Sequence, residues 1–300
     1  MFKLKSLGLL VALMGIFALF AYTVSGWVGA LLVLGVGFAI NWFSMDRAAG
    51  LILRWHRARS LSPREAPQLH YIADELASRA DIPVPHLLVY PGEMPNAFAL
   101  STRAERGAVA VSSALLRLLD RREIAGVLAH EFAHLKNRDS VLSLSAGIFV
   151  QAITWLSHGF GLFLLLYFLA GTGPLITPAL WPVLVLVGLA PTGAVLLQAA
   201  LMRTRERLAD RDGALLSGDP QGLASALYKL QQYSRYLARW YRRFRFIYTS
   251  SEDGGTEWLR THPSTEERVR ALLEMEEKMR RHPLVDKGAL YRPFYGGMAV

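Results

Sequence analysis

Charged residues are absent from several long stretches of the 300-residue chain. The longest runs for 63 residues, from Ser140 to Met202, without an Asp, Glu, Lys or Arg. It holds two candidate membrane spans, Leu142–Ala170 and Leu180–Met202, separated by the turn-forming sequence GTGPLITP. Two further uncharged stretches, Leu7–Val24 and Trp27–Phe43, are each about long enough to cross a ~30 Å hydrocarbon core. The pattern therefore predicts four transmembrane helices in two hairpins.

A cleaved secretory signal is the alternative for the first of these spans. No convincing small-residue cleavage site follows Leu7–Val24, and a second span begins at once, so we favour a membrane helix.

Basic residues flank the four predicted spans on one side only. The loops at Ser25-Gly26 and at 171–179 carry no charge, whereas Lys and Arg gather at the other four ends. These residues are Lys3, Lys5, Arg47, Arg54, Arg57, Arg59, Lys136, Arg138, Arg203, Arg205 and Arg207. Because Lys and Arg stay on the cytoplasmic side, we expect a multi-pass protein of the plasma (inner) membrane with both termini and all polar sequence in the cytoplasm.

Composition supports a membrane protein. Hydrophobic residues make up 52% of the chain, and the mean hydropathy is +0.26. The net charge of +9 fits a polar body held against anionic lipid, and we expect no nucleic-acid partner. The chain has no cysteine, which excludes thiol nucleophiles and cysteine zinc sites.

The polar sequence forms two blocks, with the second membrane hairpin inserted between them. We expect a transmembrane hairpin at 1–46, a first polar part at 47–139, the inserted hairpin at 140–202 and a second polar part at 203–300. Helical apolar spacing covers 65–80, and helical character resumes after 115. The short runs HLLVYPG, NAFAL and GAVAVSS between them predict a small antiparallel sheet. The fold class is therefore an α+β membrane protein whose polar domain is mostly helical.

The segment HEFAH places two histidines four residues apart. Positions four apart lie on one face of a helix, so His130 and His134 can present two imidazoles to one ion. Glu131 projects beside them, within reach of a metal-bound water. Zinc suits imidazole and carboxylate ligands and lowers the pKa of its bound water to roughly 7. The alternative is an ordinary packed helix in which the HEFAH sequence occurs by chance.

Catalytic zinc usually takes three protein ligands, so the sequence should supply a third. The segment RTRERLADRDGA offers Glu206 and Asp210, one helical turn apart. A glutamate ligand followed by an aspartate that accepts a ring N–H from a ligand histidine is a reasonable arrangement. A solvated acidic face that balances the neighbouring arginines is the alternative interpretation.

Four motifs together resemble the HtpX-type membrane-bound zinc metalloproteases, which are gluzincins related to the CAAX prenyl endoproteases. They are HEFAHLKNRD, ERLAD, PNAFA at 95–99 and THPSTEER at 261–268, and the resemblance covers nearly the whole chain. It implies a gluzincin catalytic domain that holds one zinc ion per chain with His130, His134 and Glu206 as ligands. It also implies Glu131 as general base and acid, and Asp210 as the residue that orients a ligand histidine. The family often has an aromatic residue after the third ligand, where this chain has Arg207.

The resemblance also suggests residues that contact substrate. In such proteases the substrate lies extended along an edge strand, which makes Asn96, Ala97 and Phe98 candidates. His262 is the candidate that stabilises the oxyanion, with Arg268 nearby.

The expected function is zinc-dependent endoproteolysis of misfolded or damaged membrane proteins at the cytoplasmic face, as part of protein quality control. The partners are then polypeptide substrates and the lipid bilayer. An intramembrane protease of the site-2 type is one alternative, because Asp212-Gly213 matches the Asp-Gly pair of that class. That chemistry places its motifs inside membrane spans, whereas charged residues flank them here. A catalytically inactive membrane scaffold is the second alternative, although Glu131 and all three ligand candidates are present.

Overall fold

The structure is a computed structural model that describes residues 5–9, 11–16, 18–19, 22, 26–28, 31, 35, 49–101, 107–170, 181–242 and 263–281. The described residues fall into two compact units. One draws on 1–44 and 141–205, and the other on 45–140, 206–253 and 263–300.

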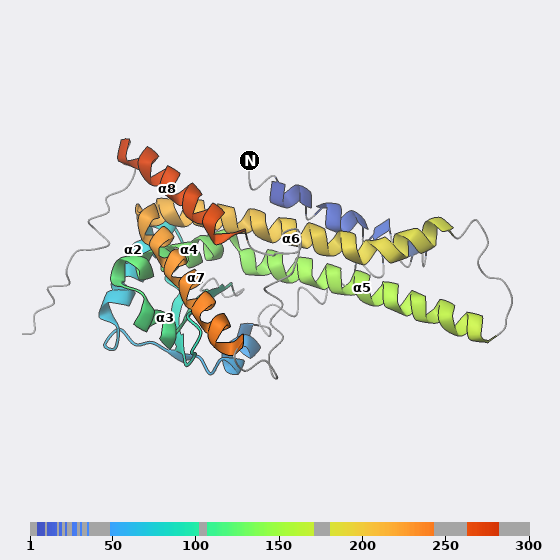
Figure 1. Cartoon of the computed structure of the whole chain (residues 1–300), viewed down its shortest axis with the longest axis horizontal. Helices are drawn as coiled ribbons and strands as arrows, with labels where there is room; N and C mark the ends of the chain where they lie inside the picture. The colour runs from blue at the N-terminus through green and yellow to red at the C-terminus, as the bar shows by residue number, and fades with distance from the viewer. Residues whose placement is uncertain are drawn as a thin grey trace, which may run out of the picture. The chain divides into compact units, whose positions relative to one another are not determined.

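The second unit is built on a four-stranded sheet with helices packed against it (Figure 1). The strands are β1 (Arg59–Ser60), β2 (His86–Tyr90), β3 (Ala97–Leu100) and β4 (Ala108–Ser112). The helices are α2 (Pro67–Ala80), α3 (Ser113–Leu118), α4 (Arg121–Asn137), α7 (Pro220–Arg242) and α8 (Thr265–Arg281), together with the C-terminal part of α6 (Trp181–Ser217).

The sheet is mixed, so the predicted purely antiparallel sheet is wrong. Its strand order is β1-β2-β4-β3. β3 pairs antiparallel with β4, whereas β2 pairs with the other side of β4 in parallel, with His86 opposite Ala108. After β2 the chain skips the neighbouring position in the sheet and forms β3 at the edge. It then returns to form β4 between β2 and β3. Local sequence does not distinguish this crossover from a simple meander, because both use the same short apolar runs. β4 is buried along its whole length, and β3 is left at an edge.

The core of this unit lies between the sheet and helices α2 and α4. Leu76 of α2 and Leu128 and Phe132 of α4 are at most 1% exposed. α4 begins with a capping box, in which Asp120 accepts from the Glu123 backbone and Glu123 accepts from the Asp120 backbone. The same Glu123 carboxylate accepts a hydrogen bond from Lys229 of α7 at 2.8 Å, which fixes α7 against the start of α4. The helix that carries HEFAH is therefore held at its N-terminus and along its buried face.

Within the described part of the chain, two helices are long and apolar enough to cross a membrane: α5 (Asp139–Leu169) and α6. They lie side by side (Figure 1), with Ile153 of α5 and Ala194 of α6 in one apolar cluster. Large apolar side chains nevertheless stay exposed, among them Trp155 at 71% and Phe168 at 77%. Large apolar side chains are costly to expose to water, and contact with lipid removes this cost.

The two N-terminal spans predicted at Leu7–Val24 and Trp27–Phe43 fall for the most part outside the described residues. Residues 5–9 and 11–16 are helical, and Leu13 packs into the cluster formed by α5 and α6.

A glycine allows α4 and α7 to approach closely. A Cβ on Gly126 would lie 2.6 Å from the backbone nitrogen of Leu223. We therefore expect Gly126→Ala to lower stability by about 1–3 kcal/mol, since overpacking against backbone forces the helices apart. Thermal unfolding in detergent measures this, with Gly159→Ala, whose Cβ meets nothing within 4 Å, as the matched control. Equal melting temperatures for the two variants would contradict the close-packing account.

Candidate metal centre and active site

His130 and His134 project from the same face of α4, as their spacing predicts. Their rings are nearly perpendicular with centroids 4.6 Å apart, and their Nε2 atoms are 3.0 Å apart. His130 is 7% exposed. The two imidazoles thus aim the same ring nitrogen at a common point.

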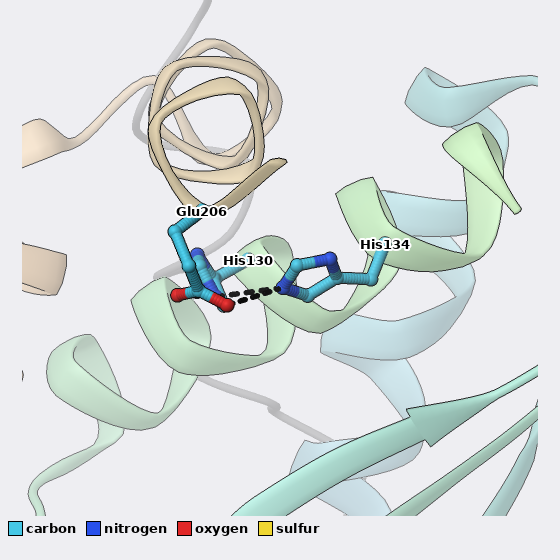
Figure 2. A group of neighbouring side chains, drawn as sticks. All are labelled: His130, His134 and Glu206. Carbon is cyan, nitrogen blue, oxygen red and sulfur yellow. Dashed lines mark hydrogen bonds and ion pairs between the residues drawn. The ribbon is translucent and has the colours of Figure 1, made fainter. Parts of the chain in front are cut away.

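Glu206 of α6 supplies the third group at this point (Figure 2). Its Oε2 lies 3.8 Å from Nε2 of His130, and its Oε1 lies 3.8 Å from Nε2 of His134. A tetrahedral zinc ion with bonds of about 2.0–2.1 Å separates its ligand atoms by about 3.3 Å. The observed separations bracket this value, so two imidazoles and a carboxylate fit a zinc ion with little movement.

The contact between α6 and α4 that brings Glu206 here depends on Gly213. A Cβ on Gly213 would lie 2.8 Å from both the Cα and the backbone nitrogen of His130. Ala129 and Ala209, fully buried, provide further small side chains on these helices. The close approach therefore occurs at a candidate ligand histidine, seven residues along α6 from Glu206, the third candidate ligand.

Each histidine is held at its other ring nitrogen by a carboxylate. Oδ1 of Asp210 lies 3.0 Å from Nδ1 of His130. Oδ2 of Asp139 lies 2.7 Å from Nδ1 of His134. Such a contact fixes the ring orientation and leaves Nε2 as the metal-facing nitrogen.

Arg268 of α8 links two of the acidic residues. Its guanidinium donates to both oxygens of Asp210 at 2.7 Å and lies 3.3 Å from Oε2 of Glu206. Burial alone would raise the pKa of Asp210, but its close contact with the His130 ring and its hydrogen bonds from Arg268 outweigh this effect and hold the pKa below its usual value. The uncharged part of α6 ends at Met202, and Asp210 lies beyond it in the charged C-terminal part of the helix. Burial likewise opposes the charge of Arg268, yet its partners, Asp210 first, raise the pKa of the guanidinium.

Sequence reasoning missed Asp139, although this residue ends the quoted motif HEFAHLKNRD. In a continuous helix the position five after His134 would lie about 140° around the axis, away from the imidazole. Arg138 instead adopts a left-handed conformation, with φ of 54°, and ends α4. The chain turns there, and Asp139 faces back to His134. A left-handed arginine leaves no recognisable sequence pattern, because glycine usually occupies such positions.

Glu131 lies beside His130 on α4 and is 8% exposed. Among the described residues, none forms a hydrogen bond or ion pair with its carboxylate. Its charge contributes to the raised pKa of Tyr90, after burial as the main cause. The carboxylate therefore has no hydrogen-bond partner within the described part of the chain, although its charge acts on Arg268, and it is available to accept and return a proton.

The predicted substrate contacts lie on and beside β3, which contacts α4. The side chain of Asn96 is exposed, and its backbone pairs with Ser112. Phe98 packs against His56 and Tyr90, with ring centroids 5.2 and 5.6 Å away. His262 lies outside the described residues. Arg268 contacts carboxylates of the site, and its role toward substrate stays a prediction.

Asp212, the ligand in the site-2 alternative, lies elsewhere. Its Oδ2 accepts a hydrogen bond from Nδ2 of Asn137 at 3.0 Å. The neighbouring Gly213 serves the helix contact with His130. These contacts give both residues of the Asp-Gly pair a packing role.

Residues 63–276 match the model of Peptidase family M48. The chain belongs to this family. It is therefore a metalloprotease by family, and its two long apolar helices fit a membrane protein.

Relatives resemble the chain over nearly its full length. It is 36% identical to a "Protease HtpX homolog" of Salinibacter ruber, covering 90% of this chain and 97% of that protein. It is 35% identical to a "Protease HtpX homolog" of Pyrococcus furiosus, covering 91% and 96%. These matches confirm the resemblance to the HtpX-type proteases.

A crystal structure of S. mikatae Ste24p has a similar fold, with a TM-score of 0.55 and 21% identity. The match covers 90% of this chain and 65% of that one, so the chain spans about two thirds of the Ste24p length. At this identity the likeness concerns the fold alone.

The two carboxylates behind the histidines should tune zinc affinity equally. We expect Asp139→Asn and Asp210→Asn each to weaken zinc binding about 10–100-fold, because the ring orientation is no longer fixed by a charged acceptor. Competition with a chromophoric chelator measures this. Asp212→Asn is the matched control and should bind zinc as the wild type does. An unchanged affinity in Asp139→Asn would show that its contact with His134 does not support the metal.

Proposed function

We propose that this M48 peptidase is a zinc-dependent endopeptidase that cleaves polypeptides, chiefly misfolded or damaged membrane proteins, at the cytoplasmic face of the inner membrane. The observation that carries the proposal is the convergence of His130, His134 and Glu206 on one point, with the unpaired Glu131 beside them. The donor set is one that zinc prefers, and it leaves a fourth position for water.

When bound, zinc lowers the pKa of a water molecule and polarises the scissile carbonyl. Glu131 would take the proton from the attacking water and return it to the leaving amine. Asp139 and Asp210 hold the imidazoles in one orientation throughout. Arg268 keeps Asp210 ionised and holds Asp210 and Glu206 in place, because a buried carboxylate without a cationic partner would be costly.

Backbone pairing with β3 is the proposed mode of substrate binding. β3 is an edge strand, and Ala97 and Phe98 lie half-buried along it. A peptide that adds itself as a fifth strand gains backbone hydrogen bonds whatever its sequence, which suits a protease for damaged proteins. The exposed amide of Asn96 then binds the substrate main chain. We assign oxyanion stabilisation to His262 on the resemblance alone.

The membrane location follows from α5 and α6 and from the basic residues at their ends. Lys136 and Arg138 precede α5, and Arg203, Arg205 and Arg207 follow the uncharged part of α6. These flanks favour a cytoplasmic site, close to membrane proteins that have lost their packing.

Glu131→Gln should keep zinc and fold but abolish proteolysis. The neutral amide has nearly the same shape and cannot take or return the proton. Cleavage of casein by the purified full-length protein, with zinc content measured on the same sample, tests this. Glu277→Gln, an exposed change on α8, is the control. Near wild-type cleavage by Glu131→Gln would end the assignment, and a wild type that binds zinc but cuts nothing would favour an inactive scaffold.

Topology reporters test the orientation. Fusions at residue 300 and near residue 100 should report the cytoplasm, whereas fusions near residues 26 and 175 should report the opposite side. A catalytic block found outside the cytoplasm would contradict both the orientation and the proposed substrates.

A further inference from the structure

The outer edge of β3 offers a defined set of backbone groups. In an antiparallel pair, the N–H and C=O of one residue point to the same side, and the side alternates along the strand. The carbonyl of Asn96 accepts from the Ser112 backbone, so Asn96 faces β4. With the observed register, Phe98 and Leu100 also face β4. Ala97, Ala99 and Ser101 therefore direct their backbone groups away from the sheet.

Ser140 already occupies part of this edge. Its hydroxyl donates to the carbonyl of Ala99 at 3.0 Å and accepts from the backbone N–H of Ser101 at 3.3 Å. One side chain thus uses two backbone groups that an added strand would otherwise bind. The outward groups that remain on β3 itself are the N–H and C=O of Ala97 and the N–H of Ala99.

The position of Ser140 is tied to the metal site. It is the second residue of α5, directly after Asp139, which contacts His134. Consecutive Cα atoms are 3.8 Å apart. Ser140 marks the end of the free edge of β3, and Asp139 contacts His134. Because these two residues are adjacent, the end of the edge is fixed relative to this candidate ligand.

We propose that Ser140 is a specificity-determining stop that ends the substrate strand on β3 and so limits how many substrate residues pair beyond the metal site. The proposal rests on the proposed function, because it needs a peptide on the edge of β3. In the wild type, Ala97 supplies the only outward carbonyl of β3 that Ser140 leaves free, so one substrate amide pairs on the strand. Removal of the Ser140 hydroxyl frees the carbonyl of Ala99 and adds a second pairing position two residues along the substrate.

An N-methyl scan tests this with the full-length protein in detergent and zinc. A peptide is taken from a site that the wild type cuts in β-casein, and its backbone amides are methylated one at a time. Ser140→Ala should gain one additional sensitive amide, two residues from one that is sensitive in the wild type. The same variant should gain about three- to tenfold in kcat/KM from a two-residue extension at that end, the effect of one or two net hydrogen bonds, whereas the wild type should gain little.

Two variants serve as controls. Ser140→Thr keeps the hydroxyl and should keep the wild-type profile, and Ser78→Ala changes an exposed serine of α2 and should have no effect. If the wild type and Ser140→Ala are sensitive to methylation of the same substrate amides, the proposal that Ser140 ends the substrate strand is wrong. Equal loss of kcat/KM on every peptide would also overturn it, because Ser140 would then be only a structural tether. Failure of the wild type to cut any peptide would instead contradict the proposed function on which the stop rests.

Discussion

The close contact between α4 and α6 at Gly213 is the constraint on which the rest of the site depends. His134 and Glu206 are 72 positions apart in the sequence, with α5 and most of α6 between them. Only a residue without a side chain fits against the backbone of His130 at this distance. Closely packed helices have no free space for an added side chain. A larger residue at position 213 would therefore push α6 away from α4 and displace Glu206.

Charge imposes a second constraint. Three carboxylates, those of Asp139, Glu206 and Asp210, lie against two imidazoles, and Arg268 contacts two of them. The charge of Glu131 also acts on Arg268. Taking this many negative charges out of water costs several kcal/mol per ion unless cations offset them. A divalent ion between the imidazoles and Glu206 would supply further positive charge. The cost of burying a negative charge also explains why the guanidinium of Arg268 binds both carboxylate oxygens of Asp210.

The sequence predicted the parts of the site that depend on regular helix geometry. The spacing of His130 and His134, and that of Glu206 and Asp210, need only a period of 3.6 residues, and both pairs lie as expected. It did not predict Asp139, because the left-handed turn at Arg138 has no glycine to mark it. It did not predict that Arg268 binds Asp210, since a sequence does not show where α8 packs this arginine, and the role of Arg268 toward substrate stays a prediction. The parallel pairing of β2 with β4 was missed because the crossover depends on contacts distant in sequence.

The central claim is that one zinc ion is held by two histidines of α4 and one glutamate of α6. Zinc X-ray absorption on the full-length protein tests it most directly, with the wild type beside Glu206→Ala and Asp212→Ala. We expect two imidazoles and oxygen ligands, with zinc–nitrogen distances of about 2.0–2.1 Å, in the wild type and in Asp212→Ala. Glu206→Ala should lose the ion or its carboxylate ligand. A wild-type shell with fewer than two imidazoles, or a shell that survives in Glu206→Ala and is lost in Asp212→Ala, would contradict the account.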